Sequence, residues 1–60
     1  MPTDAQTIGA ELTTLAALIN AARQDADNGH WIALLDDVEL MSVRLGKIRT
    51  RAATLASQSD

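Results

Sequence analysis

Few side chains in this sequence could do chemistry, and three of its eight acidic residues cluster at Asp36, Asp37 and Glu39. Paired carboxylates act as a general acid and base only where they converge on one point. Neighbouring residues on a helix point about 100° apart, so Asp36 and Asp37 do not converge. The cluster also lacks the glycine and the ligand spacing of a calcium loop. We therefore interpret it as a solvated or partner-facing acidic stripe and predict no catalytic residue.

A basic cluster follows at Arg44, Lys47, Arg49 and Arg51. Arg44, Lys47 and Arg51 are spaced so that they share one face of a helix. Such a face could contact phosphate groups, which dominate the affinity of proteins for nucleic acids. The aromatic side chains that stack on unpaired bases are missing from this stretch. The alternative is a solvated, salt-bridging helix end, and on this interpretation generic RNA and DNA should not bind.

His30 and Trp31 form the remaining notable pair. His30 has no second imidazole and no thiolate with which to share a metal ion, so we predict neither a metal site nor a cofactor. Trp31 is the only aromatic residue of the chain. It either closes the end of a helical core or presents its indole ring as an anchor for a partner.

The elements that position these clusters are visible as two rows of apolar residues. In each row the steps alternate between three and four residues, which predicts a long amphipathic helix. We call these rows the heptad seams. They are Ala5, Ile8, Leu12, Leu15, Ile19, Ala22 and Ala26 in the first half, and Trp31, Leu34, Val38, Met41, Leu45, Ile48, Ala52 and Leu55 in the second.

Capping and turn residues mark where these helices begin and end. Thr3 and Gln6 have the spacing of a capping box, which places the first helix start at about residue 4. Asn28 and Gly29 tolerate the positive φ that a helix C-terminus requires. We predict helices over about 4–26 and about 30–57, joined by a turn over about 27–30, in one domain spanning 1–60. So short a connection makes the two helices antiparallel neighbours, an all-α helical hairpin.

Size and composition indicate that the hairpin does not remain alone. A chain of 60 residues buries only about 60% of its unfolded surface, so its folded monomer is marginal. The absence of cysteine excludes disulfides as the remedy and leaves oligomerisation. No apolar run approaches the roughly 20 residues that span a membrane. Met1-Pro2-Thr3-Asp4 lacks the basic region of a signal peptide, so we expect a cytoplasmic protein.

Apolar residues outside the seams predict where a second chain binds. Ile32, Leu35, Leu40 and Val43 spread around the second helix, and an apolar surface of this extent usually marks an interface. A two-fold axis near Val43 would bring the acidic half of this helix to the basic half of its copy. The pairs would be Glu39 with Lys47, Asp37 with Arg49, and Asp36 with Arg51. The alternative is that the two charged halves only complement the helix dipole.

The two seams and the short turn resemble the Rop class of plasmid regulators, which are short acidic hairpins that dimerise into antiparallel four-helix bundles. Rop-type proteins bind paired RNA loops through polar, basic and aromatic residues on the outer face of helix one. Here that helix offers Arg23 as its only basic residue and no aromatic. The resemblance therefore implies the architecture and no functional residue.

These observations lead to one expectation about function and two alternatives. We expect a homodimeric, non-enzymatic protein-interaction or regulatory module that acts through its helical surfaces, with another protein as a further partner. The net charge of −3 disfavours general binding to nucleic acid or to anionic membranes. The first alternative is a Rop-like nucleic-acid regulator that uses Arg44, Lys47, Arg49 and Arg51. The second is a purely structural assembly subunit.

Overall fold

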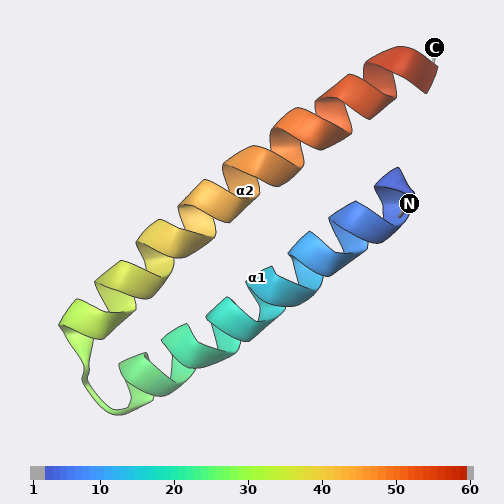
Figure 1. Cartoon of the computed structure of the whole chain (residues 1–60). Helices are drawn as coiled ribbons and strands as arrows, with labels where there is room; N and C mark the ends of the chain where they lie inside the picture. The colour runs from blue at the N-terminus through green and yellow to red at the C-terminus, as the bar shows by residue number, and fades with distance from the viewer. Residues whose placement is uncertain (1–2, 60) are drawn as a thin grey trace.

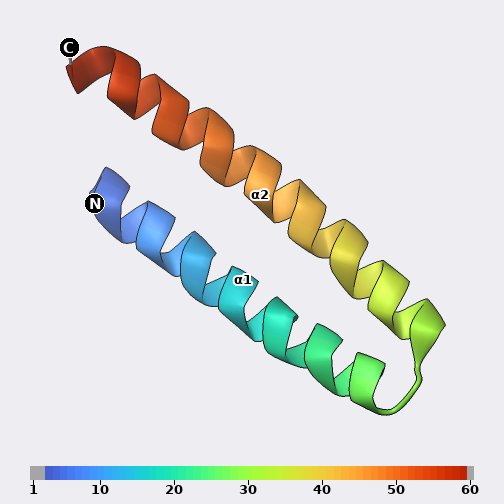
Figure 2. The same cartoon turned by 180° about the vertical axis from the view of Figure 1, so that it is seen from behind.

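Two α-helices joined by a tight turn make up the structure, a computed structural model that describes residues 3–59 (Figure 1). Helix α1 spans Asp4–Asp27 and helix α2 spans Trp31–Ser59. The helices run antiparallel and side by side, and α2 extends past the start of α1 (Figures 1 and 2). This confirms the predicted all-helical hairpin. Met1 and Pro2, from the stretch searched for a signal peptide, lie outside the described residues.

Helix α1 begins at the predicted capping box. The Thr3 hydroxyl accepts a hydrogen bond from the backbone N–H of Gln6 at 3.1 Å, and Gln6 Oε1 accepts one from the N–H of Thr3 at 2.9 Å. These two bonds satisfy donors that the first turn of a helix leaves open. Asp4 adds a negative charge at the positive end of the helix dipole. The capping box is therefore confirmed.

The turn between the helices is a Schellman motif centred on Gly29, which has a φ of +71°. The N–H of Gly29 donates to the carbonyl of Ala26 at 3.1 Å, and the N–H of His30 donates to the carbonyl of Asp25 at 2.8 Å. The backbone of a residue with a side chain would be strained at this φ, so glycine suits the position. The carbonyl of His30 then accepts from the N–H of Leu34 and opens α2.

Each helix turns one row of partly or fully buried residues toward the other, and we call these the contact rows. Only Leu15 and Ala22 are buried among the described residues. The contact row of α1 consists of Ile8, Glu11, Leu15, Leu18, Ala22 and Asp25, and that of α2 consists of Leu34, Asp37, Met41, Arg44, Ile48 and Leu55. Both rows therefore mix apolar residues with charged ones.

The contact rows differ from the heptad seams, because each helix is rotated about its axis relative to a seam-to-seam arrangement. On α2 the two rows share Leu34, Met41, Ile48 and Leu55, but Val38 and Leu45 of the seam lie outside the contact. On α1, Leu12 and Ile19 are likewise exposed. In each seam, alternate residues thus pack between the two helices, and the residues between them face outward on one side of the hairpin.

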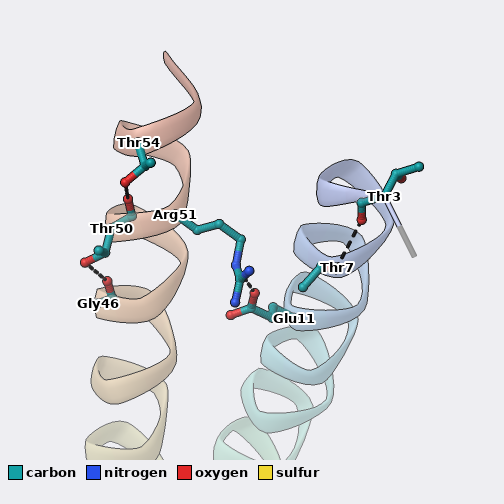
Figure 3. Close-up of polar contacts among 7 residues, drawn as sticks. All are labelled: Thr3, Thr7, Glu11, Gly46, Thr50, Arg51 and Thr54. Carbon is teal, nitrogen blue, oxygen red and sulfur yellow. Dashed lines mark hydrogen bonds and ion pairs between the residues drawn. The ribbon is translucent and has the colours of Figure 1, made fainter. Parts of the chain in front are cut away.

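Threonines along both helices satisfy their hydroxyl groups within their own helix. Thr7 donates to the carbonyl of Thr3, and Thr50 and Thr54 donate to the carbonyls of Gly46 and Thr50, all at 3.0–3.1 Å (Figure 3). Each of these bonds gives the hydroxyl donor a partner in the preceding turn, at a slight cost to the stability of the helix. These polar groups therefore need no partner on the other helix.

Candidate interaction surface

The most distinctive surface feature of the hairpin is its exposed apolar residues. Nine large apolar side chains are exposed within residues 3–59, and they lie mainly on α2. They are Leu12, Ile19, Trp31, Ile32, Leu35, Val38, Leu40, Val43 and Leu45. Soluble monomers rarely leave large contiguous apolar patches uncovered, so we asked which of these side chains share one side of the molecule.

Four of them form a single surface that crosses both helices. Leu12 and Ile19 follow buried or half-buried residues of the α1 contact row, Ile8 and Leu15, by four positions. Val38 and Leu45 follow Leu34 and Met41 on α2 by the same step. The two-fold axis that exchanges two antiparallel helices is perpendicular to the plane that contains them. Rotation about this axis keeps each residue on the same side of that plane, so equivalent positions on the two helices lie on the same side of the pair. We call the surface formed by Leu12, Ile19, Val38 and Leu45 the open flank.

The open flank continues to the turn end of the hairpin through Trp31. The indole is 62% exposed, so within one chain Trp31 does not close the helical core. The four residues of the flank itself are between 48% and 52% exposed, half in contact with the hairpin and half open to water. Each of these side chains therefore keeps apolar surface that contact with a partner would remove from water.

Two further predicted interface residues, Ile32 and Val43, lie on the outer face of α2, away from α1. Positions 32, 36, 39 and 43 follow one another at steps of three and four residues, so they line one strip of the helix. Asp36, Glu39, Leu40 and Val43 surround a shallow hollow there. This strip is one helix wide and carries two carboxylates, whereas the open flank is two helices wide.

The acidic cluster is divided between two faces of α2. Asp36 and Glu39 are exposed, but Asp37 is half-buried in the contact row beside Asp25 of α1. A hydrogen bond to Asp25 raises the pKa of the Asp37 carboxyl, and partial burial and the charges of Asp25 and Asp36 raise it further. Oδ2 of Asp37 is buried and has no hydrogen-bond partner among the described residues. The surroundings of Asp37 therefore favour the protonated form of its carboxyl.

The imidazole of His30 lies at the end of this acidic pair. Its Nδ1 atom is 3.8 Å from Oδ1 of Asp25, and its side chain is largely exposed. In the part of the chain that the structure describes, no three His, Asp or Glu side chains come together in a way that could hold a metal ion. The carboxylates and the imidazole near the turn thus form local electrostatic contacts.

The basic cluster is divided as well. Arg44 is half-buried and lines a hollow together with Glu11 and Thr14. Lys47 and Arg51 line a second hollow together with Asp4, and Arg51 forms an ion pair with Glu11 across the helices (Figure 3). Arg49 is exposed at the position that follows Leu45 by four residues, next to the open flank. Each hollow with a basic lining therefore also contains a carboxylate, which lowers its attraction for phosphate.

Comparisons with known proteins found no counterpart. No family model, no curated protein and no solved structure matches this chain. The chain's own geometry is therefore the basis for a proposal. None of the helices within residues 3–59 combines the length and the apolar character needed to cross a membrane.

The residues of the open flank lie in a different environment from the one that the heptad seams predict. The four residues belong to the seams and were therefore expected in the hairpin core, but each of them is about half exposed in the structure. The ion pair between Glu11 and Arg51 was not predicted at all. Its sequence signal is weak, because the two residues are 40 positions apart and meet only through the register of the hairpin.

Proposed function

We propose that this chain is a small, non-enzymatic protein-interaction module that self-associates through its helical surfaces. One observation carries the proposal. Only Leu15 and Ala22 are buried among the described residues, whereas nine large apolar side chains are exposed. A domain with so small a core gains stability when a partner covers this surface, and oligomerisation is a common route for short chains without disulfides.

The energetics of the exposed side chains support association. Burying a whole leucine or isoleucine side chain stabilises a protein by about 1.5–3 kcal/mol. Because the residues of the open flank are already half covered, each would add on the order of 1 kcal/mol when a partner covers the rest. Several such contributions are needed, since association also restricts the motion of both partners. A surface with many half-exposed apolar residues meets that requirement.

The placement of the basic residues favours a protein partner over nucleic acid. Arg51 already has a carboxylate partner in its own chain, and Arg44 is half-buried beside Glu11. Lys47 and Arg49 remain exposed, on different sides of α2. A protein that binds nucleic acid usually presents several basic side chains on one accessible face. We therefore keep nucleic-acid binding as an outcome of the test below and not as a second proposal.

Sedimentation equilibrium over a wide range of protein concentration tests self-association directly. The expected result is an average mass that rises from monomer to a defined oligomer as the concentration rises. A monomer at every concentration, with cooperative unfolding, would contradict the proposal. An electrophoretic shift with RNA or DNA at moderate salt, in the absence of self-association, would favour the nucleic-acid alternative.

A further inference from the structure

We infer that a second copy of this chain covers the open flank, so that the two hairpins form a four-helix bundle with their α2 helices antiparallel. The two-fold axis would pass close to residue 44. This inference rests on the proposed function and deepens it, because it names the partner and the face. It differs from an interface on the outer strip of α2, where Ile32 and Val43 lie.

The composition of the open flank suits a copy of the same chain. Next to its four large residues lies a row of exposed residues that are mostly small or apolar: Gly9, Ala16, Leu35, Ser42 and Ala56. The charged residues in this row are Arg23 and Arg49. Small residues let a second pair of helices approach closely, and large ones then fill the space between the layers. Because both helices contribute, the surface can be covered by another two-helix surface of the same width.

The dimensions of the hairpin agree with a stable dimer. The chain measures 46 × 18 × 15 Å along its principal axes. A typical stable interface buries about 800 Å² on each partner, which is close to the product of the two longer dimensions. A copy that covered one whole side of the hairpin would therefore reach the size class of specific interfaces. The outer strip of α2, one helix wide, offers less.

Charge complementarity sets the orientation. Arg49 borders the open flank, and Glu39 lies on the outer strip, three positions before Ser42 of the row beside the flank. Within residues 3–59 neither forms an ion pair. An antiparallel copy with its axis at residue 44, midway between 39 and 49, brings Glu39 of each chain to Arg49 of the other. Arg51 needs no such partner, because it already contacts Glu11. A second copy in this orientation would thus give Arg49 a carboxylate partner, whereas Arg23, the other charged residue beside the flank, gains none.

A matched pair of leucines provides the decisive experiment. Leu45 lies on the open flank and Leu40 lies on the opposite side of α2, and the two are equally exposed at 52% and 54%. Leu45→Lys should weaken self-association at least about tenfold, because it places a charge in the covered surface. Leu40→Lys should leave the dissociation constant within about twofold. Sedimentation equilibrium measures both, and the fluorescence of Trp31 reports burial of the turn end.

Cross-linking gives a second test that does not depend on the stability of a lysine variant. The chain has no cysteine, so Ser42→Cys and Val43→Cys each introduce a unique thiol. These neighbours point about 100° apart, Ser42 toward the open flank and Val43 toward the outer strip. With a short bismaleimide, Ser42→Cys should form covalent dimers much faster than Val43→Cys at the same protein concentration.

The outcomes separate this inference from the proposed function. A dimer that Leu40→Lys dissociates and Leu45→Lys does not, or that cross-links faster through Val43→Cys, would overturn the inference and leave self-association intact. A wild-type chain that remains monomeric at all concentrations would overturn both. A dimer that responds to Leu45→Lys and cross-links through Ser42→Cys supports the assignment of the face.

Discussion

Arg51 of α2 reaches across the hairpin to Glu11 of α1, with its Nε atom 2.9 Å from Glu11 Oε1 (Figure 3). The side chain of Glu11 is only 11% exposed, whereas that of Arg51 is 43% exposed. Among the described residues Oε1 has no hydrogen-bond partner, so the contact is an ion pair and not a well-formed hydrogen bond. The midpoint of residues 11 and 51 is residue 31, as is the midpoint of Asp25 and Asp37. Both polar contacts therefore belong to one hairpin register.

Removing Arg51 should destabilise the hairpin. In the Arg51→Ala variant a shielded carboxylate loses its partner, and we expect the free energy of unfolding to fall by about 1 kcal/mol. Urea denaturation followed by circular dichroism measures the change. Lys47→Ala is the control, since Lys47 lies one turn away and is exposed. Its effect should stay within a few tenths of a kcal/mol, and equal losses in the two variants would show that the ion pair contributes nothing.

Replacing Asp37 should stabilise the hairpin at neutral pH. The folded chain raises the pKa of Asp37, so the folded state holds this proton more tightly than the unfolded state does. The stability from the protonated group is present below the ordinary pKa of 3.8 and is lost as the pH rises through the elevated value. Asparagine does not ionise, so the Asp37→Asn variant does not lose this stability as the pH rises. We therefore expect a higher midpoint of thermal unfolding for the variant at pH 7 and convergence with the wild type in acid.

Asp36→Asn is the matched control for this pH dependence. It removes a carboxylate from the same helix, but the charge of Asp36 is the smallest of the causes that raise the pKa of Asp37. Its stabilising effect at pH 7 should therefore be smaller than that of Asp37→Asn. Thermal unfolding from pH 3 to pH 8 compares the two, and a larger effect of Asp36→Asn would refute the role assigned to the pair of Asp25 and Asp37.

The hairpin was predictable because its signals are local. The capping box of Thr3 and Gln6 and the glycine at position 29 mark a helix start and a helix end within a few residues. The alternation of apolar residues identifies the helices between them. Such features act before any tertiary contact forms, so they can be recognised without knowing what the helices pack against. Helix α2 runs to Ser59, slightly past the predicted end.

The rotation of the helices was not predictable from the same pattern. The seam of α2 and its contact row have the same three-and-four spacing and share Leu34, Met41 and Ile48. Between these shared residues the seam has Val38 and Leu45, whereas the contact row has Asp37 and Arg44. Apolarity alone favours the former, but which set faces α1 depends on how far each helix turns about its axis.

The rotation also affects the predicted interface charges. Asp37 and Arg51 were expected to face a second chain, and the structure places both toward α1, beside Asp25 and Glu11. Ile32, Leu35, Leu40 and Val43 are exposed, as an interface requires. They lie on several sides of α2, however, so a sequence-based grouping could not say which of them act together.

Truncating Leu15 should weaken the fold more than truncating Leu12. Both are leucines of α1, but Leu15 is buried against α2 and Leu12 is about half exposed. We expect Leu15→Ala to lower the free energy of unfolding by about 2 kcal/mol. This is the lower end of the range for Leu→Ala substitutions in protein cores, because the core of this hairpin is small. In dilute protein Leu12→Ala should have about half that effect. Urea denaturation of both variants gives the comparison, and a greater loss for Leu12→Ala would mean that the contact rows are assigned incorrectly.

Alanine substitutions at two glycines should change stability in opposite directions. At Gly29 the φ of +71° is strained for a residue with a side chain, so Gly29→Ala should destabilise the hairpin by about 1 kcal/mol. At Gly46, within α2, an added methyl group meets no described atom within 4 Å beyond its chain neighbours and the nearby backbone of its own helix. Gly46→Ala should therefore stabilise the helix, by up to about 1 kcal/mol.

Thermal unfolding of the two glycine variants tests the turn geometry against simple helix propensity. If the turn were a loose connection, Gly29→Ala would be neutral or stabilising, because alanine restricts the unfolded chain more than glycine does. Gly29→Asn serves as the intermediate case, since asparagine adopts positive φ more readily than alanine. We expect the stability of the hairpin to decrease in the order glycine, asparagine, alanine at position 29. A variant series in which alanine equals glycine would show that the Schellman motif does not determine where α1 ends.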